Sequence, residues 1–315
     1  RDILIQRSSL PSMAGFDASI YANMGEMDNK GVDANLEYQT RIGNKVGLRL
    51  FGNLTYSKNK IVFRDEPAMQ YAYQKSEGTR YGEFYGYIAE GYFQSEEEIK
   101  KSPRQMRELA PGDIKYKDLN DDGVIDANDQ CYLGKSWFPS WSYGMGFNIN
   151  YHNFDLALFF QGVSDVSIMA NGGSIDTGNG DWGASGVGIV PFTGMGLNPS
   201  NVITKALDRW TADNPRADAW YPRMTANATT NDNNYVNSTH WLKDGSYLRL
   251  KQASLGYTLE NKKLMDKGIE YLYFYLSGQN LLTFSKFKLW DPELGSNGAK
   301  YPLSRMVTLG MRVSF

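Results

Sequence analysis

The chain has 315 residues, of which 41% are hydrophobic, 14% aromatic and 22% charged. Its formal net charge of −2 and its lack of a basic tract argue against a nucleic-acid partner, which would require a basic stripe. No apolar stretch reaches the roughly 20 residues that a membrane-spanning helix needs, which excludes a helical membrane protein and leaves a soluble all-β protein or a β-barrel.

Eight segments are predicted to be β-strands, most of them because apolar and polar residues alternate with a period of two. In chain order they are residues 2–9, 32–42, 46–56, 141–151, 154–160, 247–257, 271–281 and 305–315. The alternation changes phase near Lys251 and Gln252, where we expect a β-bulge. Residues 271–281 are apolar on both faces. The sequence therefore predicts an all-β protein with about eight antiparallel strands.

The last strand shows the character of these segments most clearly. Val307, Leu309, Met311, Val313 and Phe315 share one face, and small or polar residues occupy the other. Residues 32–42 repeat this pattern with a fully polar second face. An unbroken apolar ribbon on one face suits the lipid-facing wall of a barrel better than the edge of a soluble sandwich. We therefore predict a transmembrane β-barrel wall.

Two groups of apolar residues test this interpretation. Seven aromatic residues lie near predicted strand ends, where an aromatic girdle would meet the lipid headgroups. They are Tyr38, Tyr56, Tyr143, Tyr151, Tyr257, Trp141 and Trp241. Ordinary sheet core is the alternative role for each of them. Four residues of the apolar face are expected to contact lipid: Leu36, Phe147, Leu156 and Leu309. If they pointed into a shared protein interior, the barrel interpretation would be wrong.

The connections between the strands alternate in length. The short ones are residues 43–45, 151–153 and 259–270, and the long ones are residues 10–31, 57–140, 164–246 and 283–304. Outer-membrane barrels keep short turns on the periplasmic side and long loops outside. We therefore expect residues 57–140 and 164–246 to be two long extracellular loops. Short helices are predicted at residues 96–101 and 206–215.

Residues 118–129 follow the spacing of an EF-hand calcium loop. The candidate ligands are Asp118, Asn120, Asp122, the carbonyl of Val124, Asp126 and Asp129. Side chains at alternate positions of a tight loop converge on one point, and Gly123 permits the turn. Asp129 replaces the usual glutamate. We expect a structural Ca²⁺ that holds an extracellular loop; the alternative is an Asx-rich turn that needs no metal.

Four tryptophans of the long connections are candidate substrate-binding residues because aromatic faces can stack on a ligand. They are Trp182, Trp210, Trp220 and Trp290. The alternative is that these rings pack the loops against one another.

Catalysis finds little support in the sequence. Cys131 is the only cysteine, so the chain has neither an internal disulfide nor a Cys/His zinc site. The two histidines, His152 and His240, are expected at opposite ends of the strands and without a triad arrangement. The protein is therefore predicted not to be an enzyme.

Several blocks of sequence carry a family resemblance. Residues 111–126, 133–134, 143–144 and 154–162 are followed in order by the blocks 241–251, 255–257, 277–284 and 290–293, and residues 23–32 precede them. Together they resemble the C-terminal part of a SusC/RagA-type TonB-dependent transporter. The resemblance extends over nearly the whole chain, 1–315.

This resemblance implies a bacterial outer-membrane barrel of about 22 strands with a plugged lumen, of which this chain is the C-terminal part. The chain opens at Arg1 without a start methionine or signal region, so it is either a mature form or a fragment of a longer protein. The resemblance implies that the plug domain and the TonB-contacting segment lie upstream of Arg1. The implied partners are a SusD-like surface lipoprotein, the TonB complex through the absent N-terminal part, outer-membrane lipid and a nutrient ligand. The implied activity is import of an oligosaccharide, glycan fragment or oligopeptide.

Two other functions remain open at this point. A passive outer-membrane porin would share the barrel but have an open lumen. A soluble calcium-dependent glycan-binding β protein would use the same loop and tryptophans and would purify without detergent. The sequence does not choose among the substrates that the resembling family carries.

Overall fold

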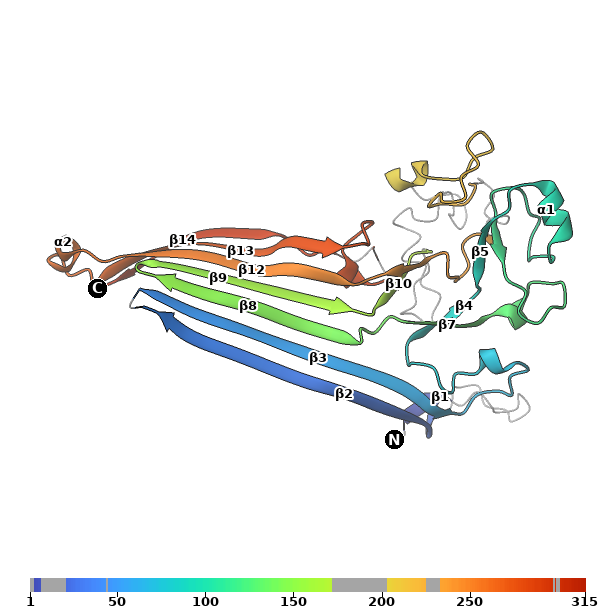
Figure 1. Ribbon diagram of the computed structural model, residues 1–315, viewed down its shortest axis with the longest axis horizontal. Helices are drawn as coiled ribbons and strands as arrows, with labels where there is room; N and C mark the ends of the chain where they lie inside the picture. The colour runs from blue at the N-terminus through green and yellow to red at the C-terminus, as the bar shows by residue number, and fades with distance from the viewer. Residues whose placement is uncertain are drawn as a thin grey trace.

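The structure is a computed structural model of the chain that describes residues 3–6, 21–43, 45–171, 203–224, 233–296, 298 and 301–315. Its main element is a single antiparallel sheet of eight strands in the order β1-β2-β3-β8-β9-β12-β13-β14 (Figure 1). The strands are β1 (Ile3–Gln6), β2 (Tyr21–Ile42), β3 (Val46–Arg64), β8 (Trp141–Tyr151), β9 (Phe154–Ser164), β12 (Tyr247–Leu259), β13 (Tyr271–Ser285) and β14 (Met306–Ser314). All eight predicted strands are therefore confirmed, each paired with its neighbour along the chain.

Five strands are longer than their apolar patterns predicted, and the difference is largest in β2 and β3. β2 begins at Tyr21 instead of residue 32, and β3 continues to Arg64 instead of residue 56, so β3 includes the first residues of the predicted 57–140 loop. The added pairs include charged residues, such as Asp28 opposite Lys60. Backbone ladder hydrogen bonds do not depend on side-chain polarity, so a hairpin can continue beyond the segment with an apolar face.

One face of the sheet is apolar and open to its surroundings. The register places Ile149 opposite Leu156, Leu156 opposite Leu255, and Leu276 opposite Leu309. Directly opposed residues lie on the same face, so these pairs form one apolar surface across the wall.

The four test residues lie on this surface and outside the protein interior. Leu36 is 75% exposed and Leu309 is 80% exposed, while Phe147 and Leu156 are partly exposed. None of the four belongs to a core cluster of the described residues. The result agrees with a lipid-facing wall.

The other face is polar and carries aromatic rings that fill the space over glycines. The Phe51 and Phe159 rings are stacked with centroids 6.0 Å apart, and a Cβ on Gly146 would lie 2.4 Å from the Phe51 ring. Likewise, a Cβ on Gly310 would lie 2.2 Å from the Tyr275 ring. Aromatic rings over cross-strand glycines stabilise a curved sheet. This packing explains why residues 271–281 are apolar on both faces.

The predicted β-bulge is also present. The register of β12 shifts between Leu250 and Gln252. Against β9, Lys251 is the extra residue. Against β13 the extra residue lies in β13, where Asn280 and Leu281 stand opposite Lys251 alone. On the opposing β13, Asn280 adopts a left-handed backbone with a φ of 52°. A bulge of this kind changes the face of every residue beyond it, which accounts for the phase switch in the sequence.

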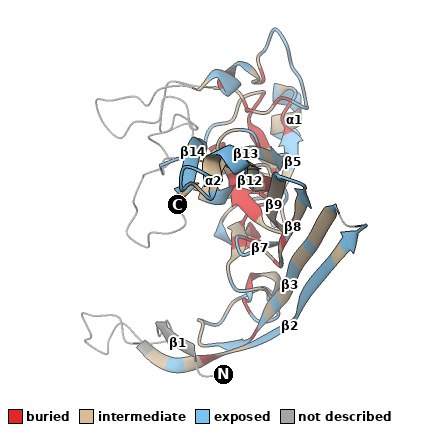
Figure 2. Cartoon of the chain, turned by 90° about the vertical axis from the view of Figure 1, so that its left-hand side faces the viewer, coloured by how far each residue is buried: buried red, intermediate tan, exposed pale blue. Residues whose placement is uncertain are grey.

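The two ends of the sheet differ in their connections (Figure 1). One end has only short turns and the four-residue helix α2 (Lys262–Met265). At the other end, the described parts of the long connections gather and include the helix α1 (Glu96–Lys101). Buried residues concentrate at this loop end, while the sheet is mostly half-buried or exposed (Figure 2). In the described part of the chain, the helices are too short to cross a membrane.

The two predicted loop helices have different outcomes. The helix at residues 96–101 is confirmed, and its N-cap residue Ser95 accepts a hydrogen bond from the Glu98 amide. The helix predicted at residues 206–215 is wrong, since only one 3-10 turn, η5 (Thr204–Leu207), forms there. The chain beyond it forms turns and isolated bridges instead, because its backbone bonds elsewhere: the Trp210 amide donates to the Tyr221 carbonyl at 2.9 Å, and the Asn214 amide donates to the Thr211 carbonyl at 3.0 Å.

Candidate functional site

The two long connections fold together around Trp241, which is fully buried. Its ring contacts Trp220 at 5.4 Å and Tyr235 at 5.3 Å between centroids. Its indole N–H donates a hydrogen bond to the Asn234 carbonyl at 2.7 Å. The prediction that Trp241 belongs to a lipid-facing girdle is therefore wrong. Its apolar ring is covered by other loop aromatics and its polar N–H has a protein partner, which is the usual arrangement of a buried tryptophan.

Short strands pair within each long connection, and backbone hydrogen bonds join the two connections. In the first long connection, β4 (Glu83–Gly86) pairs with β7 (Cys131–Ser136), and β5 (Ala89–Tyr92) pairs with β6 (Ile114–Tyr116). In the second, β10 (Ser167–Met169) pairs with β11 (Leu242–Asp244). The two connections meet where the Tyr87 amide donates to the Asn237 carbonyl at 2.9 Å and the Thr239 amide donates to the Tyr87 carbonyl at 3.0 Å. The loops thus form one packed unit.

A buried polar network joins the same two connections. Asp113 is 1% exposed and accepts hydrogen bonds from Arg223 Nη2 at 2.9 Å and from Asn234 Nδ2 at 2.8 Å. Asn234 Oδ1 in turn accepts from the Ile114 amide at 2.9 Å. A buried network that is well satisfied rigidifies a core and favours one arrangement of its elements. This network holds the surface that the loops present.

The calcium-like loop has the turn that its sequence predicts. Gly123 has a φ of 80°, a conformation that favours glycine. Asp118 Oδ2 accepts the Gly123 amide at 2.8 Å, and Asp122 Oδ1 accepts the Val124 amide at 2.9 Å. The buried Ile125 follows, and its amide donates to the Arg104 carbonyl at 2.8 Å. The loop is therefore closed and anchored to the loop core.

The side-chain oxygens of this loop differ in their hydrogen-bond partners. Asp118 Oδ1 is buried and has no hydrogen-bond partner among the described residues. Asp129 is fully buried, and its oxygens accept the amides of Leu119 at 2.7 Å and Asp126 at 2.9 Å. Asn120 Nδ2 donates to Asp122 Oδ2 at 2.8 Å. Across the described ranges, no three His, Cys, Asp or Glu side chains form a cluster that could hold a metal. The calcium ligands therefore remain predictions.

The four predicted tryptophans have different surroundings. Trp182 lies outside the described residues. Trp210 is only 6% exposed and packs against Gly112, so it is part of the loop core, as the packing alternative predicted. Trp290 is half-buried and donates its indole N–H to the Gly295 carbonyl at 2.8 Å. Trp220 is the one of the described three that lines the pocket described next.

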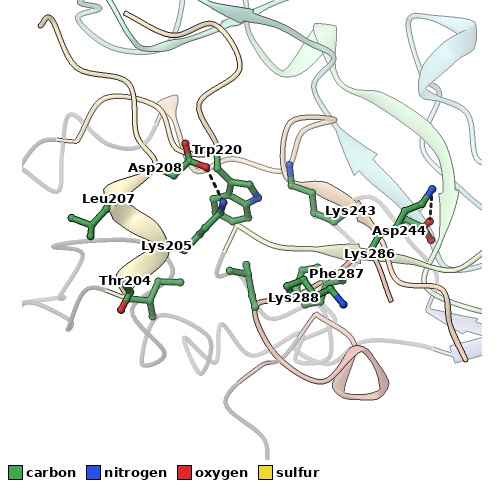
Figure 3. Close-up of a pocket in the computed structure, with 12 residues that line it drawn as sticks. Thr204, Lys205, Leu207, Asp208, Trp220, Lys243, Asp244, Lys286, Phe287 and Lys288 are labelled. Atoms are coloured by element: carbon green, nitrogen blue, oxygen red, sulfur yellow. Dashed lines mark hydrogen bonds and ion pairs between the residues drawn. The ribbon is translucent and has the colours of Figure 1, made fainter. Parts of the chain in front are cut away.

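This pocket, called the Trp220 pocket, has a volume of about 760 Å³. Its lining comes from the η5 turn, from Trp220, from β11 and from the residues that follow β13 (Figure 3). The lining residues are Ile203, Thr204, Lys205, Leu207, Asp208, Trp220, Lys243, Asp244, Lys286, Phe287, Lys288 and Leu289. Ligand pockets are typically about 300–1,000 Å³ in volume, so this one can hold a small ligand.

Charge is distributed unevenly in the Trp220 pocket. Lys205 pairs with Asp208 at 2.8 Å, and Lys286 lies 3.9 Å from Asp244. Lys288 has no carboxylate within ion-pair distance among the described residues. Four lysines against two aspartates leave two positive charges. The pocket therefore attracts anions.

Lys243 is the most enclosed of the four lysines. Its ammonium group donates to the His240 carbonyl at 2.6 Å and lies 5.2 Å from the centroid of the Trp220 ring. Burial lowers the pKa of Lys243, and the nearby charge of Lys205 lowers it further. Burial also lowers the pKa of the neighbouring His240 to about 4, so that histidine is neutral at neutral pH. Both shifts arise from removing a charged form from water.

Of this pocket, the sequence had indicated only Trp220. Its lysines come from three separate parts of the chain: residues 203–208, β11 and the residues after β13. No motif links these positions in the sequence. Only folding brings them together.

A scan against protein-family models found no match for this chain. Among curated proteins, TonB-dependent receptor P3 of Formosa agariphila is 27% identical, with all of this chain and 31% of that protein covered. TonB-dependent receptor SusC of Bacteroides thetaiotaomicron is 22% identical, with all of this chain and 29% of that protein covered. A solved structure of the RagAB peptide importer in the closed-closed state matches all of this chain and 32% of its own chain, with a TM-score of 0.70 and 23% identity.

These comparisons confirm the resemblance to SusC/RagA-type TonB-dependent transporters and the barrel-wall fold. The named relatives are receptors and an importer. The chain spans about 30% of the length of the curated relatives that it matches. In the described residues its sheet does not close on itself, as expected for one segment of a larger barrel.

Proposed function

Because the whole chain matches the C-terminal portion of SusC/RagA-type TonB-dependent receptors, we propose that it forms part of an importer in the bacterial outer membrane. In this proposal, β1 to β3, β8, β9 and β12 to β14 are barrel wall, and the packed loop unit faces the exterior. The transported nutrient is an oligosaccharide, a glycan fragment or an oligopeptide.

The observation that carries the proposal is the two-faced wall with loops at one end only. The apolar face includes Leu36 and Leu309, which are 75% and 80% exposed. Such exposure is costly in water and favourable in hydrocarbon. The opposite face carries polar residues such as Asn53 and Gln161, which suit a lumen. Strand connections at the far end are short turns, as on the periplasmic side of such barrels.

We assign the packed loop unit a role in meeting a SusD-like lipoprotein. A lid protein requires an ordered docking surface, because a mobile surface would lose conformational entropy each time the lid closes. The loop unit supplies one through the buried Trp241 and the Asp113 network. Energy coupling to the TonB complex belongs to parts of the transporter that lie outside the matched region.

The test uses the full-length transporter expressed with its lid lipoprotein in an outer-membrane host. We expect detergent to be required for extraction, the two proteins to co-purify, and nutrient uptake to stop when TonB is deleted. Uptake that continues without TonB would support the passive porin instead. A monodisperse protein extracted in aqueous buffer would support the soluble glycan-binding alternative and overturn the proposal.

We further propose that residues 118–129 bind a structural Ca²⁺. The support is the unpartnered, buried Asp118 Oδ1, the left-handed Gly123, and the spacing of the acidic residues. Asp118, Asn120, Asp122, Asp126, Asp129 and the Val124 carbonyl would hold the ion. Their oxygens must move closer together, because Asn120 now bonds to Asp122.

Isothermal titration of the full-length protein tests this site. We expect Ca²⁺ to bind and to raise the melting temperature, and Asp118→Ala to remove both effects. The control is Asp213→Ala, which changes an exposed aspartate outside the 118–129 loop. Calcium binding that is unchanged in Asp118→Ala would place the ion elsewhere.

A further inference from the structure

We propose that the Trp220 pocket is a binding subsite for an acidic sugar, a pyranose unit that carries a carboxylate, within the imported ligand. This inference rests on the proposed import function and specifies the ligand class of one site. It assigns the pocket lysines to ligand binding, a role that neither their sequence positions nor the matched relatives' names suggest.

The first argument is charge. Two of the four lysines are offset by Asp208 and Asp244, which leaves Lys243 and Lys288 without a carboxylate partner in the described chain. Like charges gathered around one pocket repel, and a bound anion reduces that repulsion. A structural pocket would gain nothing from this arrangement. A pocket for a negatively charged ligand requires it.

The second argument is the enclosure of Lys243. Its ammonium group lies over the Trp220 ring and donates to one backbone carbonyl, that of His240. A lysine ammonium has three donors, so two remain for other acceptors. A partly desolvated ammonium is costly unless it is paired. A ligand carboxylate at this position would provide the charge-assisted hydrogen bonds that the protein itself does not supply.

The third argument is that the pocket combines aromatic surface with carboxylate oxygens. Trp220 and Phe287 supply aromatic area on different walls of the pocket (Figure 3). Asp208 and Asp244 supply carboxylate oxygens that can accept from hydroxyl groups. A sugar acid combines an apolar ring face, several hydroxyl donors and a carboxylate. An acidic peptide has the carboxylate and lacks the hydroxyl-bearing ring, so it matches the pocket less completely.

The experiment measures equilibrium binding to the full-length transporter purified with its lid lipoprotein. The probes are trisaccharides of galacturonate, mannuronate and guluronate, each compared with its neutral methyl ester, and the peptide triglutamate. We expect at least one acid to bind about tenfold or more tightly than its ester. Binding should weaken as the salt concentration rises, because salt screens partly exposed charges.

Three variants locate the site. Lys243→Gln and Lys288→Gln should each weaken binding of the acid about threefold to tenfold and leave the ester unaffected. Lys288 is exposed, so its replacement keeps the test valid if Lys243→Gln does not fold. Lys101→Gln, at the exposed end of α1 and outside the pocket, is the matched control and should bind as the unaltered protein does.

Three results would overturn the inference. They are no binding of any acid, equal binding of acid and ester, and triglutamate binding that is as tight and equally sensitive to Lys288→Gln. TonB-dependent uptake of a nutrient together with any of these results would leave the proposed function intact and remove only the acidic-sugar subsite. Loss of TonB dependence would instead remove the function itself.

Discussion

Replacing Leu276 by arginine tests whether the apolar face of the wall lies in hydrocarbon. Leu276 is 47% exposed and is opposed by Leu255 and Leu309 on the neighbouring strands. It lies five residues from Tyr271, the first residue of β13 at the turn end. With a rise of about 3.4 Å per residue and a tilt of about 40°, it sits roughly 13 Å into an apolar band about 25 Å tall.

This depth sets the expected magnitude. An arginine on the lipid face costs about 2–4 kcal/mol near the bilayer midplane and about 0–1 kcal/mol near the interfaces. Because Leu276 lies near half the height of the band, we expect Leu276→Arg to destabilise the folded barrel by about 2–4 kcal/mol. The measurement is the urea midpoint of the full-length transporter refolded in lipid vesicles, with a heat-modifiable shift in gel mobility as the readout of folding.

The matched control is the next residue along the chain. Ser277 is opposed by Ser254 and Thr308 on the polar face, so Ser277→Arg places the same charge at nearly the same depth toward the lumen. We expect it to cost clearly less than Leu276→Arg. Equal costs for the two variants, or a larger cost for Ser277→Arg, would refute the assignment of the two faces.

Three further predictions concern packing and burial. A Cβ at Gly310 would lie 2.2 Å from the Tyr275 ring, so Gly310→Val should lower the free energy of unfolding by about 1–3 kcal/mol, and Tyr275→Ala in the same chain should recover part of the loss in urea melts. Burial lowers the pKa of His240 to about 4 from an ordinary value of 6.5; the unfolded chain therefore binds more protons between these values, and the stabilising contribution is present above pH 6.5 and lost as the pH falls toward 4. Melting temperatures of His240→Asn should fall less steeply over this range than those of the unaltered protein, while His152→Asn, at an exposed turn, should follow the unaltered protein. Asp113→Ala leaves its arginine partner unpaired in the loop core and should destabilise the loops by about 3–5 kcal/mol, which faster protease cleavage of the loops would reveal and unchanged cleavage would contradict.

The sheet was predictable because its determinants are local. A period of two assigns each residue of a strand to one face, and one buried or lipid-facing surface then fixes the register of its neighbours. The same reasoning located the β-bulge at Lys251, the extra residue of β12 against β9, from the phase switch alone. The ends of β2 and β3 were missed because their outer residues pair through the backbone without an apolar pattern.

The loop unit was less predictable for a physical reason. From its local sequence, Trp241 cannot be distinguished from an aromatic residue of the lipid-facing girdle. Only its contacts with Trp220 and Tyr235 place it in a core. The 206–215 segment has helical composition, yet the backbone hydrogen bond from Trp210 to Tyr221 diverts it from a helix. Intrinsic helix preference is weak and yields to such contacts.

The sequence by itself determined the central residues of each wall strand, which face of the wall is apolar, and where the tight turn at Gly123 forms. These features depend on residues within a few positions of one another, where chain geometry allows few arrangements. Only the tertiary structure decided that Lys205, Lys243 and Lys288 share a pocket with Trp220. Their proximity results from packing the 164–246 connection against the residues that follow β13, and no local pattern records a contact between residues so far apart in the chain.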